Sequence, residues 1–216
     1  MQNHLKIDFV SDVSCPWCAI GLQSLQTALD RLEGQAEVEI HFQPFELNPH
    51  MVPEGQDITE HLSEKYGSTP EQAAQAREAI RARGEALGFT FNMAKRGRIY
   101  NTFDAHRLLH WAESEGKQMA LKKALLKAYF TDGENPSDTA LLVRVAGEVG
   151  LDTARAAAIL DSDTFADEVR AQEQFYLGQG INSVPAVIIN DRHLISGGQP
   201  PEVFEQALRQ ITGIAA

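Results

Sequence analysis

The two cysteines of this chain, Cys15 and Cys18, stand in one Cys-Pro-Trp-Cys motif just after residues 5–10, which alternate as a β-strand does. Pro16 occupies the place of a first helical residue, because its missing N–H would be unpaired there in any case. A helix is therefore expected to begin between the two sulfurs. Cysteines one helical turn apart lie within the separation that a disulfide tolerates.

The residues after the motif predict a βαβ unit. Leucines recur at helical spacing over residues 22–32, and Gly34 follows as a stop signal. Residues 38–43 alternate strictly between apolar and polar side chains, which predicts a second strand. The cysteines therefore lie at the first turn of a βαβ unit.

Residues 57–179 change to helical periods separated by capping residues such as Thr69 and Asp152. Residues 180–190 are extended, Asn190 and Asp191 predict a tight turn, and a return strand and a last helix follow. The order is βαβ, helices, then ββα, with the helical part interrupting one sheet. Helices are expected at residues 69–88, 101–116, 118–130, 138–149, 153–161, 164–178 and 201–212.

Charge and hydropathy exclude several classes of partner. The net charge of −11 provides no basic patch for nucleic acid or anionic lipid, and no apolar run reaches the length of about 18 residues typical of a membrane span. The first ten residues lack the pattern of a secretory signal, so a cytoplasmic location is expected. In a reducing cytosol, a CxxC motif is more often redox-active or metal-binding than structural.

The two sulfurs have different expected roles. A free cysteine is only about 3% ionised at pH 7, and a helix N-terminus favours the thiolate. Cys15, at the cap position, receives that help and is expected to be the exposed nucleophile. Cys18 lies one turn further in, so it is expected to be buried, less ionised and the resolving thiol.

The chain resembles a known family in its order of elements and in specific motifs. A βαβ unit with CxxC, followed much later by Val-Pro before a hairpin, resembles the thioredoxin fold, and the long helical insertion resembles its DsbA-like branch. Within that branch, FrnE-type dithiol oxidoreductases are similar in the segments DFVSDVSCPWC, FQPFELNP, NTFDAHRLLHWA, AYFTDGENPSD and SVPAVIIN with ISGGQPPE.

This resemblance implies an α/β thioredoxin fold with a large all-helical insertion domain. Residues 1–56 and 180–216 form the thioredoxin-like domain, and residues 57–179 form the insertion. The architecture also resembles 2-hydroxychromene-2-carboxylate isomerases and kappa-class glutathione transferases. The resemblance further implies that the Val184–Pro185 bond is cis and faces the sulfurs, which leaves the Val184 backbone free to pair with an extended substrate.

The sequence departs from the family at one position. Thioredoxin-like proteins often carry a buried acid six residues before the first cysteine, as a proton acceptor for the resolving thiol, and here that residue is Phe9. Asp8 and Asp12 are the two alternatives. Trp17 lies between the cysteines and is expected to be exposed as a contact for substrate or glutathione.

Other interpretations of these residues remain open. Cys15 and Cys18 could form half of a structural zinc site with His106 and His110, which lie at i and i+4 of a predicted helix. The large sequence gap between the two pairs argues against zinc, so we expect no metal.

Nearby aromatic residues and one turn also allow two interpretations. Phe103, His106 and Trp111 either line a substrate cleft or belong to a helix core. The Gly197–Gly198 turn is a tight connection or a binding place for a carboxylate.

The sequence thus predicts a cytoplasmic thiol-disulfide oxidoreductase or isomerase that acts on protein or small-molecule thiols and disulfides. It needs no bound cofactor, with glutathione as a candidate co-substrate, and a homodimer is compatible with the chain. The alternative is a glutathione-dependent transferase or isomerase, which needs no second cysteine. A third option is a binding protein whose thiols are vestigial or hold zinc. The direction of electron flow stays open.

Overall fold

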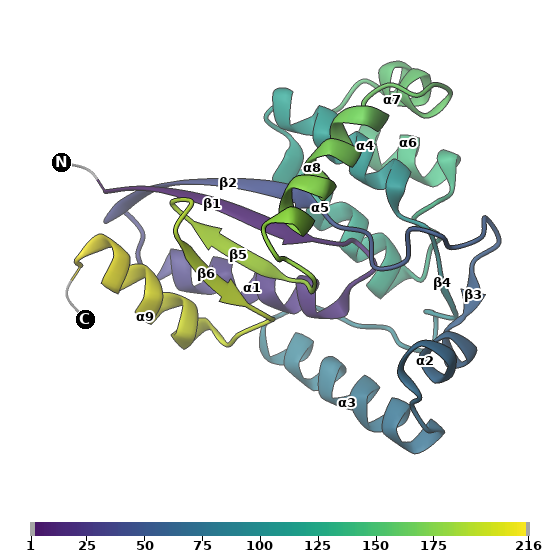
Figure 1. Cartoon of the computed structure of the whole chain (residues 1–216), viewed down its shortest axis with the longest axis horizontal. Coiled ribbons are helices and arrows are strands. Elements are labelled where there is room, and N and C mark those ends of the chain that lie inside the picture. The colour runs from purple at the N-terminus through teal and green to yellow at the C-terminus, as the bar shows by residue number, and fades with distance from the viewer. Residues whose placement is uncertain (1–2, 215–216) are drawn as a thin grey trace.

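A mixed four-stranded sheet runs through the centre of the computed structural model, which describes residues 3–214 (Figure 1). The strand order is β2-β1-β5-β6; β1 pairs with β2 in parallel and with β5 antiparallel, and β5 and β6 form a hairpin. This topology confirms the predicted βαβ…ββα thioredoxin fold. The strands are β1 (Asn3–Ser11), β2 (Ala36–Pro44), β5 (Ala186–Ile189) and β6 (His193–Ser196).

Helices cover both faces of the sheet. Helix α1 (Pro16–Asp30) packs with α9 (Pro201–Thr212) on one face, and α8 (Ala166–Gly178) lies over the other, against β2 (Figure 1). Side chains of β1 alternate between these faces: Phe9 joins the core around α1, whereas Val10 packs with Tyr176 of α8. The position of a residue along β1 therefore decides whether its side chain points toward α1 and the cysteines or toward α8.

The interrupting segment contains the expected helices together with α2, which the sequence pattern did not predict, and capping side chains explain where several helices begin. Side chains of Thr69, Asp138 and Asp152 accept hydrogen bonds from the first backbone N–H groups of the helices that follow them. Helix α5 continues into a short π-helix, η1. The elements are α2 (Ile58–Tyr66), α3 (Pro70–Ala86), α4 (Phe103–Ser114), α5 (Gln118–Lys127), η1 (Ala128–Asp132), α6 (Thr139–Glu148) and α7 (Thr153–Leu160).

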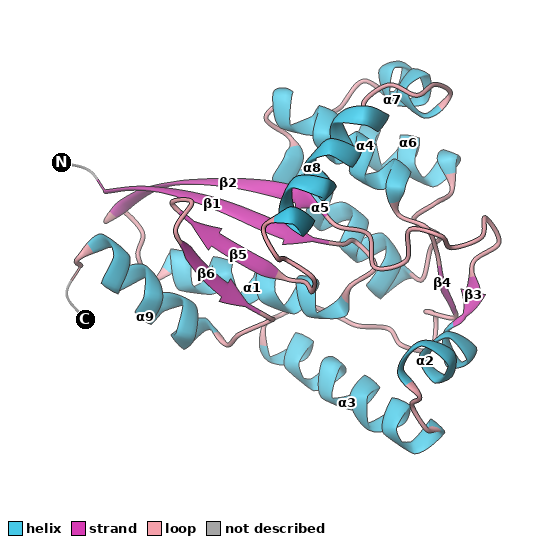
Figure 2. Cartoon of the chain, in the orientation of Figure 1, coloured by secondary structure: helices cyan, strands magenta, loops and turns pink. Residues whose placement is uncertain are grey.

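The segment differs from the all-helical prediction in one place. Strands β3 (Gln56–Asp57) and β4 (Arg98–Ile99) form a short antiparallel ladder beside α2 (Figure 2). Gly55 permits this approach, because its φ is +69° and a Cβ there would lie 2.4 Å from the carbonyl oxygen of Ile99. Two-residue strands have no sequence period, so the pattern could not reveal them.

One hydrophobic core joins the two parts of the chain. Buried side chains from β1, α1 and β5 pack in the same cluster as residues of the interrupting segment. The segment therefore shares the core that supports the cysteine helix. Its contributions to this cluster are Ile80, Phe91, Leu126, Tyr129 and Phe130.

Two further sequence predictions can be compared with the structure. Asn190 and Asp191 both have positive φ, at 52° and 55°, which confirms the tight turn between β5 and β6. Within residues 3–214, none of the helices combines the length and the apolar character that crossing a membrane requires.

Candidate active site

Cys15 and Cys18 lie at the start of α1 as the motif predicts. Cys15 is the N-cap, Pro16 is the first helical residue, and the Cys15 Sγ accepts a hydrogen bond from the Cys18 backbone N–H at 3.3 Å. Both cysteines are free thiols. A thiolate at Cys15 would keep the same N–H donor, and a charged acceptor makes that bond stronger.

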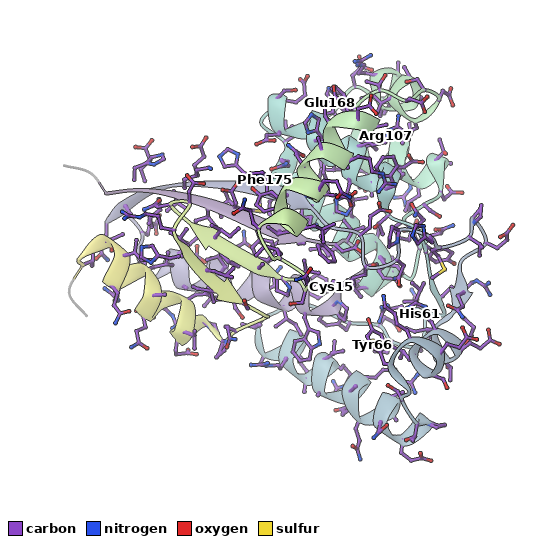
Figure 3. The ribbon with its side chains drawn as sticks, in the orientation of Figure 1. Cys15, His61, Tyr66, Arg107, Glu168 and Phe175 are labelled. Atoms are coloured by element: carbon purple, nitrogen blue, oxygen red, sulfur yellow. The ribbon has the colours of Figure 1, made fainter. Side chains whose placement is uncertain are left out.

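The predicted exposure of Cys15 is wrong, because the side chain is only 3% exposed. The loop before β5 closes over it, and the Cys15 thiol lies 3.7 Å from the carbonyl oxygen of Val184, to which it donates. Figure 3 places Cys15 at the end of α1 that faces α2, the helix that carries Tyr66 and His61. Segments far away in the sequence thus cover the Cys15 sulfur, which the motif alone predicts to be exposed.

Cys18 is fully buried, as expected for the resolving thiol. Burial raises its pKa well above the ordinary value, and the neighbouring Cys15 raises it further. The positive charge of Lys122 acts in the opposite direction. Attack by Cys18 therefore requires that a proton leave an apolar interior.

The Val184–Pro185 bond is cis, as the resemblance implies. A Cβ at Gly21 would lie 3.1 Å from the Pro185 Cγ, so the absence of a side chain on that turn of α1 brings the helix close to the proline. The Pro185 carbonyl accepts a hydrogen bond from Gly197 N–H at 2.8 Å. The cysteine motif and the Val184–Pro185 pair, which are far apart in the sequence, therefore lie at one site.

Trp17 is exposed at the edge of the site, with 37% of the residue accessible. The guanidinium of Arg83 on α3 lies 5.6 Å from the centre of the indole ring, within cation–π range. Gly198 packs against the same residue, since a Cβ there would lie 2.8 Å from the Trp17 carbonyl oxygen. The glycine turn therefore fixes the position of Trp17.

This close approach gives a first testable prediction. Gly198→Ala is expected to lower the free energy of unfolding by about 1–3 kcal/mol, because the Trp17 backbone must move to admit the methyl group. Gly97→Ala is the control, since a Cβ at Gly97 meets nothing within 4 Å. Urea unfolding of the two variants makes the comparison, and equal stability would contradict the packing described.

Asp8 lies on the wrong face of the sheet to accept a proton from Cys18. Its carboxylate accepts a hydrogen bond from Gln43 Nε2 at 2.7 Å and pairs with Lys6 Nζ at 3.0 Å. It shares the α8 face of β1 with Val10. Of the two predicted alternatives, only Asp12 lies on the side of the cysteines.

Asp12 is completely buried in the turn between β1 and α1. Its carboxylate accepts hydrogen bonds from the backbone N–H groups of Ser14 at 3.1 Å and Leu47 at 2.7 Å, and His106 Nε2 lies 3.7 Å away. Burial alone would raise the pKa of Asp12, but His106 and the two N–H donors outweigh it and hold the pKa at about 2. Asp12 is thus an ionised anchor of the active-site turn and a weak base.

The residues considered for zinc are arranged differently. His106 lies beside Asp12, whereas the ring of His110 packs on Phe165 with centroids 5.1 Å apart. Among the described residues, 3–214, no group of three or more His, Cys, Asp or Glu side chains could hold a metal ion. The four-ligand zinc site is therefore not formed.

The structure favours a packing role for two of the cleft candidates. Trp111 is buried in the core of the interrupting segment and donates a hydrogen bond to Glu115 Oε1 at 3.2 Å. Phe103 is half-buried beneath the guanidinium of Arg170, 3.7 Å from the ring centre.

Sequence reasoning missed Lys122 on α5. The residue is 1% exposed, and its Nζ lies 5.7 Å from the centre of the Phe42 ring. Its charge acts on Cys18. A signal was available, because Lys122 occupies the apolar stripe of the helix: the buried residues of α5 are Gln118, Leu121, Lys122, Leu125 and Leu126.

Comparisons with known proteins find similarity over nearly the whole chain. The model of the DSBA-like thioredoxin domain family matches residues 6–209. The uncharacterized protein YwbO of Bacillus subtilis is 29% identical over 209 residues, which are 96% of each chain. The similarity thus covers both the sheet and the interrupting helices.

Solved structures show the same fold. A probable DsbA oxidoreductase from Streptomyces coelicolor is 34% identical, with a TM-score of 0.91, over 99% of this chain and 92% of that one. The cytosolic disulfide reductase DsbM of Pseudomonas aeruginosa, solved with GSH, has a TM-score of 0.66 at 16% identity, over 97% of this chain and 100% of that one. At that identity, the second likeness concerns the fold alone.

Proposed function

Because this chain belongs to the DSBA-like thioredoxin domain family, we propose that it is a thiol-disulfide oxidoreductase that works through a mixed disulfide on Cys15, resolved by Cys18. One observation carries the proposal. The two free thiols lie one helical turn apart at the start of α1, and the Cys18 N–H donates to the Cys15 sulfur at 3.3 Å. This arrangement suits reversible disulfide formation.

The chemistry proceeds in two exchange steps. The Cys15 thiolate attacks one sulfur of a substrate disulfide, a mixed disulfide forms, and the other substrate sulfur leaves as a thiolate. Cys18 then gives up its proton and attacks the Cys15 sulfur. The Cys15–Cys18 bond forms, the second substrate sulfur leaves and takes up a proton, and the substrate has gained two electrons from the dithiol. The reverse sequence oxidises a substrate dithiol.

Val184 and Trp17 are proposed to bind the substrate. The Val184 carbonyl lies 3.7 Å from the Cys15 sulfur, so a substrate chain extended along this backbone would bring its own sulfur to Cys15. Pro185 presents that backbone edge, and the exposed Trp17 ring offers an apolar contact beside it. The substrates that we propose for this surface are protein or small-molecule thiols and disulfides.

We place the protein in the cytoplasm with glutathione as a candidate co-substrate. The support is the use of both cysteines in one redox motif and the likeness of the fold to a cytosolic disulfide reductase solved with GSH. An equilibrium with glutathione disulfide, followed by mass spectrometry, would give the reduction potential and so the direction of electron flow.

The alternative, a glutathione-dependent transferase or isomerase, needs one activated sulfur and no resolving thiol. The position of Cys18 beside Cys15 argues against it. Activity on a hydroxychromene carboxylate that survives in Cys18→Ala would favour this alternative over disulfide exchange.

The proposed function is tested with Cys18→Ala. Incubation with glutathione disulfide is expected to leave this variant as a stable mixed disulfide on Cys15, because no internal thiol remains to displace glutathione. The wild-type protein should pass on to the internal disulfide under the same conditions. Intact-mass spectrometry distinguishes the two products. Turnover of a dithiol substrate by Cys18→Ala at the wild-type rate would overturn the proposed division of roles.

A further inference from the structure

Lys122 is a buried cation for which the fold supplies no ion pair. The residue is 1% exposed, and within residues 3–214 its ammonium forms no ion pair and no hydrogen bond; its Nζ lies 5.7 Å from the centre of the Phe42 ring. Lysine is almost never fully buried without a partner, because removing its charge from water is costly. A favourable interaction must therefore offset the cost of burying the Lys122 charge.

The charges near Lys122 indicate which group its ammonium stabilises. Burial lowers the pKa of Lys122, and among neighbouring charges Cys18 counteracts this most, followed by Asp12 and Cys15. The same interaction lowers the pKa of Cys18. Both residues pack in the same region of the core, since Phe42 beneath Lys122 belongs to the cluster that contains Cys18.

Asp12 does not neutralise Lys122 in a direct pair. Its carboxylate oxygens already accept hydrogen bonds from Ser14 and Leu47 and lie beside His106. No carboxylate of β1 faces the cysteine, because Phe9 occupies the inward position and lies 5.7 Å from Phe42, ring centre to ring centre. The inward-facing residue of β1 beside Phe42 is therefore an apolar ring and not a carboxylate.

We propose that Lys122 is a positioning residue whose positive charge stabilises the thiolate of Cys18 while it resolves the mixed disulfide. The proposal rests on the proposed function. In that step Cys18 loses its proton, the Cys15–Cys18 bond forms, the bond from Cys15 to the substrate breaks, and the departing thiolate takes up a proton. Lys122 exchanges no electrons; it lowers the cost of a negative charge in an apolar interior.

Phe42, the residue of β2 that contacts Lys122, does not titrate. The titratable groups near Lys122 and Cys18 lie on other elements: Asp12 in the turn after β1, Cys15 at the N-cap of α1, His106 on α4 and Tyr129 of η1, whose ring lies 5.0 Å from the Arg96 guanidinium.

The test uses 5,5′-dithiobis(2-nitrobenzoate) as the disulfide substrate. Cys15 releases one nitrothiobenzoate and keeps the other as a mixed disulfide, and attack by Cys18 releases the second, which absorbance follows in a stopped-flow instrument. Lys122→Met is expected to slow the second release about tenfold near neutral pH and to move its pH profile to higher pH. The first release should be less affected, since Cys15 keeps its N–H donor.

Leu126→Met is the control, because Leu126 lies on the same helix in the cluster of Cys18 and carries no charge. The thermal midpoint of Lys122→Met should stay equal or rise, since a buried charge is replaced by an apolar chain. If that variant fails to fold, Lys122→Gln makes the same comparison. A second release with the wild-type rate and pH profile would overturn the proposal for Lys122, whereas a wild-type protein that never releases the second group would overturn the proposed function.

Discussion

Cys15→Ser is expected to abolish dithiol–disulfide exchange, with a loss of at least about a thousandfold in rate. A serine hydroxyl is not appreciably ionised near neutral pH, so it cannot form the mixed disulfide on which both steps depend. The fold should be unaffected, because serine is a favoured N-cap and its oxygen can accept the Cys18 N–H as the sulfur does. The variant should therefore lose activity without losing stability.

Reduction of insulin disulfides in the presence of a thiol reductant measures the effect, with urea unfolding as the test of the fold. Ser24→Ala is a matched control on α1, because the buried Ser24 hydroxyl has no hydrogen-bond partner among the described residues. It should retain full activity. Exchange by Cys15→Ser at the wild-type rate would require another nucleophile and would remove Cys15 from the mechanism.

Asp12→Ala is expected to lower the free energy of unfolding by about 3–5 kcal/mol, the largest stability effect at the site. The substitution leaves the N–H groups of Ser14 and Leu47 without their acceptor in a buried turn, and it leaves His106 without its acidic neighbour. The turn that presents Cys15 would then lose its anchor. Urea unfolding at pH 7 measures the loss, and a change below about 1 kcal/mol would contradict it.

The same carboxylate predicts a pH dependence. Its pKa is about 2 in the folded protein, below the ordinary value of 3.8, so the folded state favours the ionised form. This contribution, about 2 kcal/mol, is fully present above pH 4 to 5 and disappears as the pH falls toward 2. Asp12→Asn should remove this part of the acid sensitivity. An identical decline in stability between pH 5 and pH 2 for both proteins would show that other carboxylates cause it.

Local rules account for what the sequence predicted well. The proline after Cys15, the capping side chains of Thr69 and Asp152, and the alternation of residues 38–43 act over a few residues, so each pattern specifies its own element. The resemblance added the cis bond at Pro185, which no local rule would have placed beside the sulfurs.

Burial and partnership were harder to foresee, because they arise between segments far apart in the chain. Cys15 is covered by the backbone of Val184, and the charge of Lys122 acts on the buried Cys18. A motif reports the conformation of its own residues and not what packs over them. The lysine in the apolar stripe of α5 was the visible sign that a helix of the insertion carries a charge into the core.

The pairing of β1 with β5 also sets an order of events during synthesis. Strand β1 can pair with β2 early, but the register that joins Ile7 to Ile189 must await the end of the chain. Residues 45–185 emerge in between, which at about 5–20 residues per second takes on the order of ten seconds. For that time the nascent protein carries its dithiol with neither Val184 nor β5 beside it. The nascent chain is thus itself a candidate for unwanted oxidation, until the loop that carries Val184 covers Cys15.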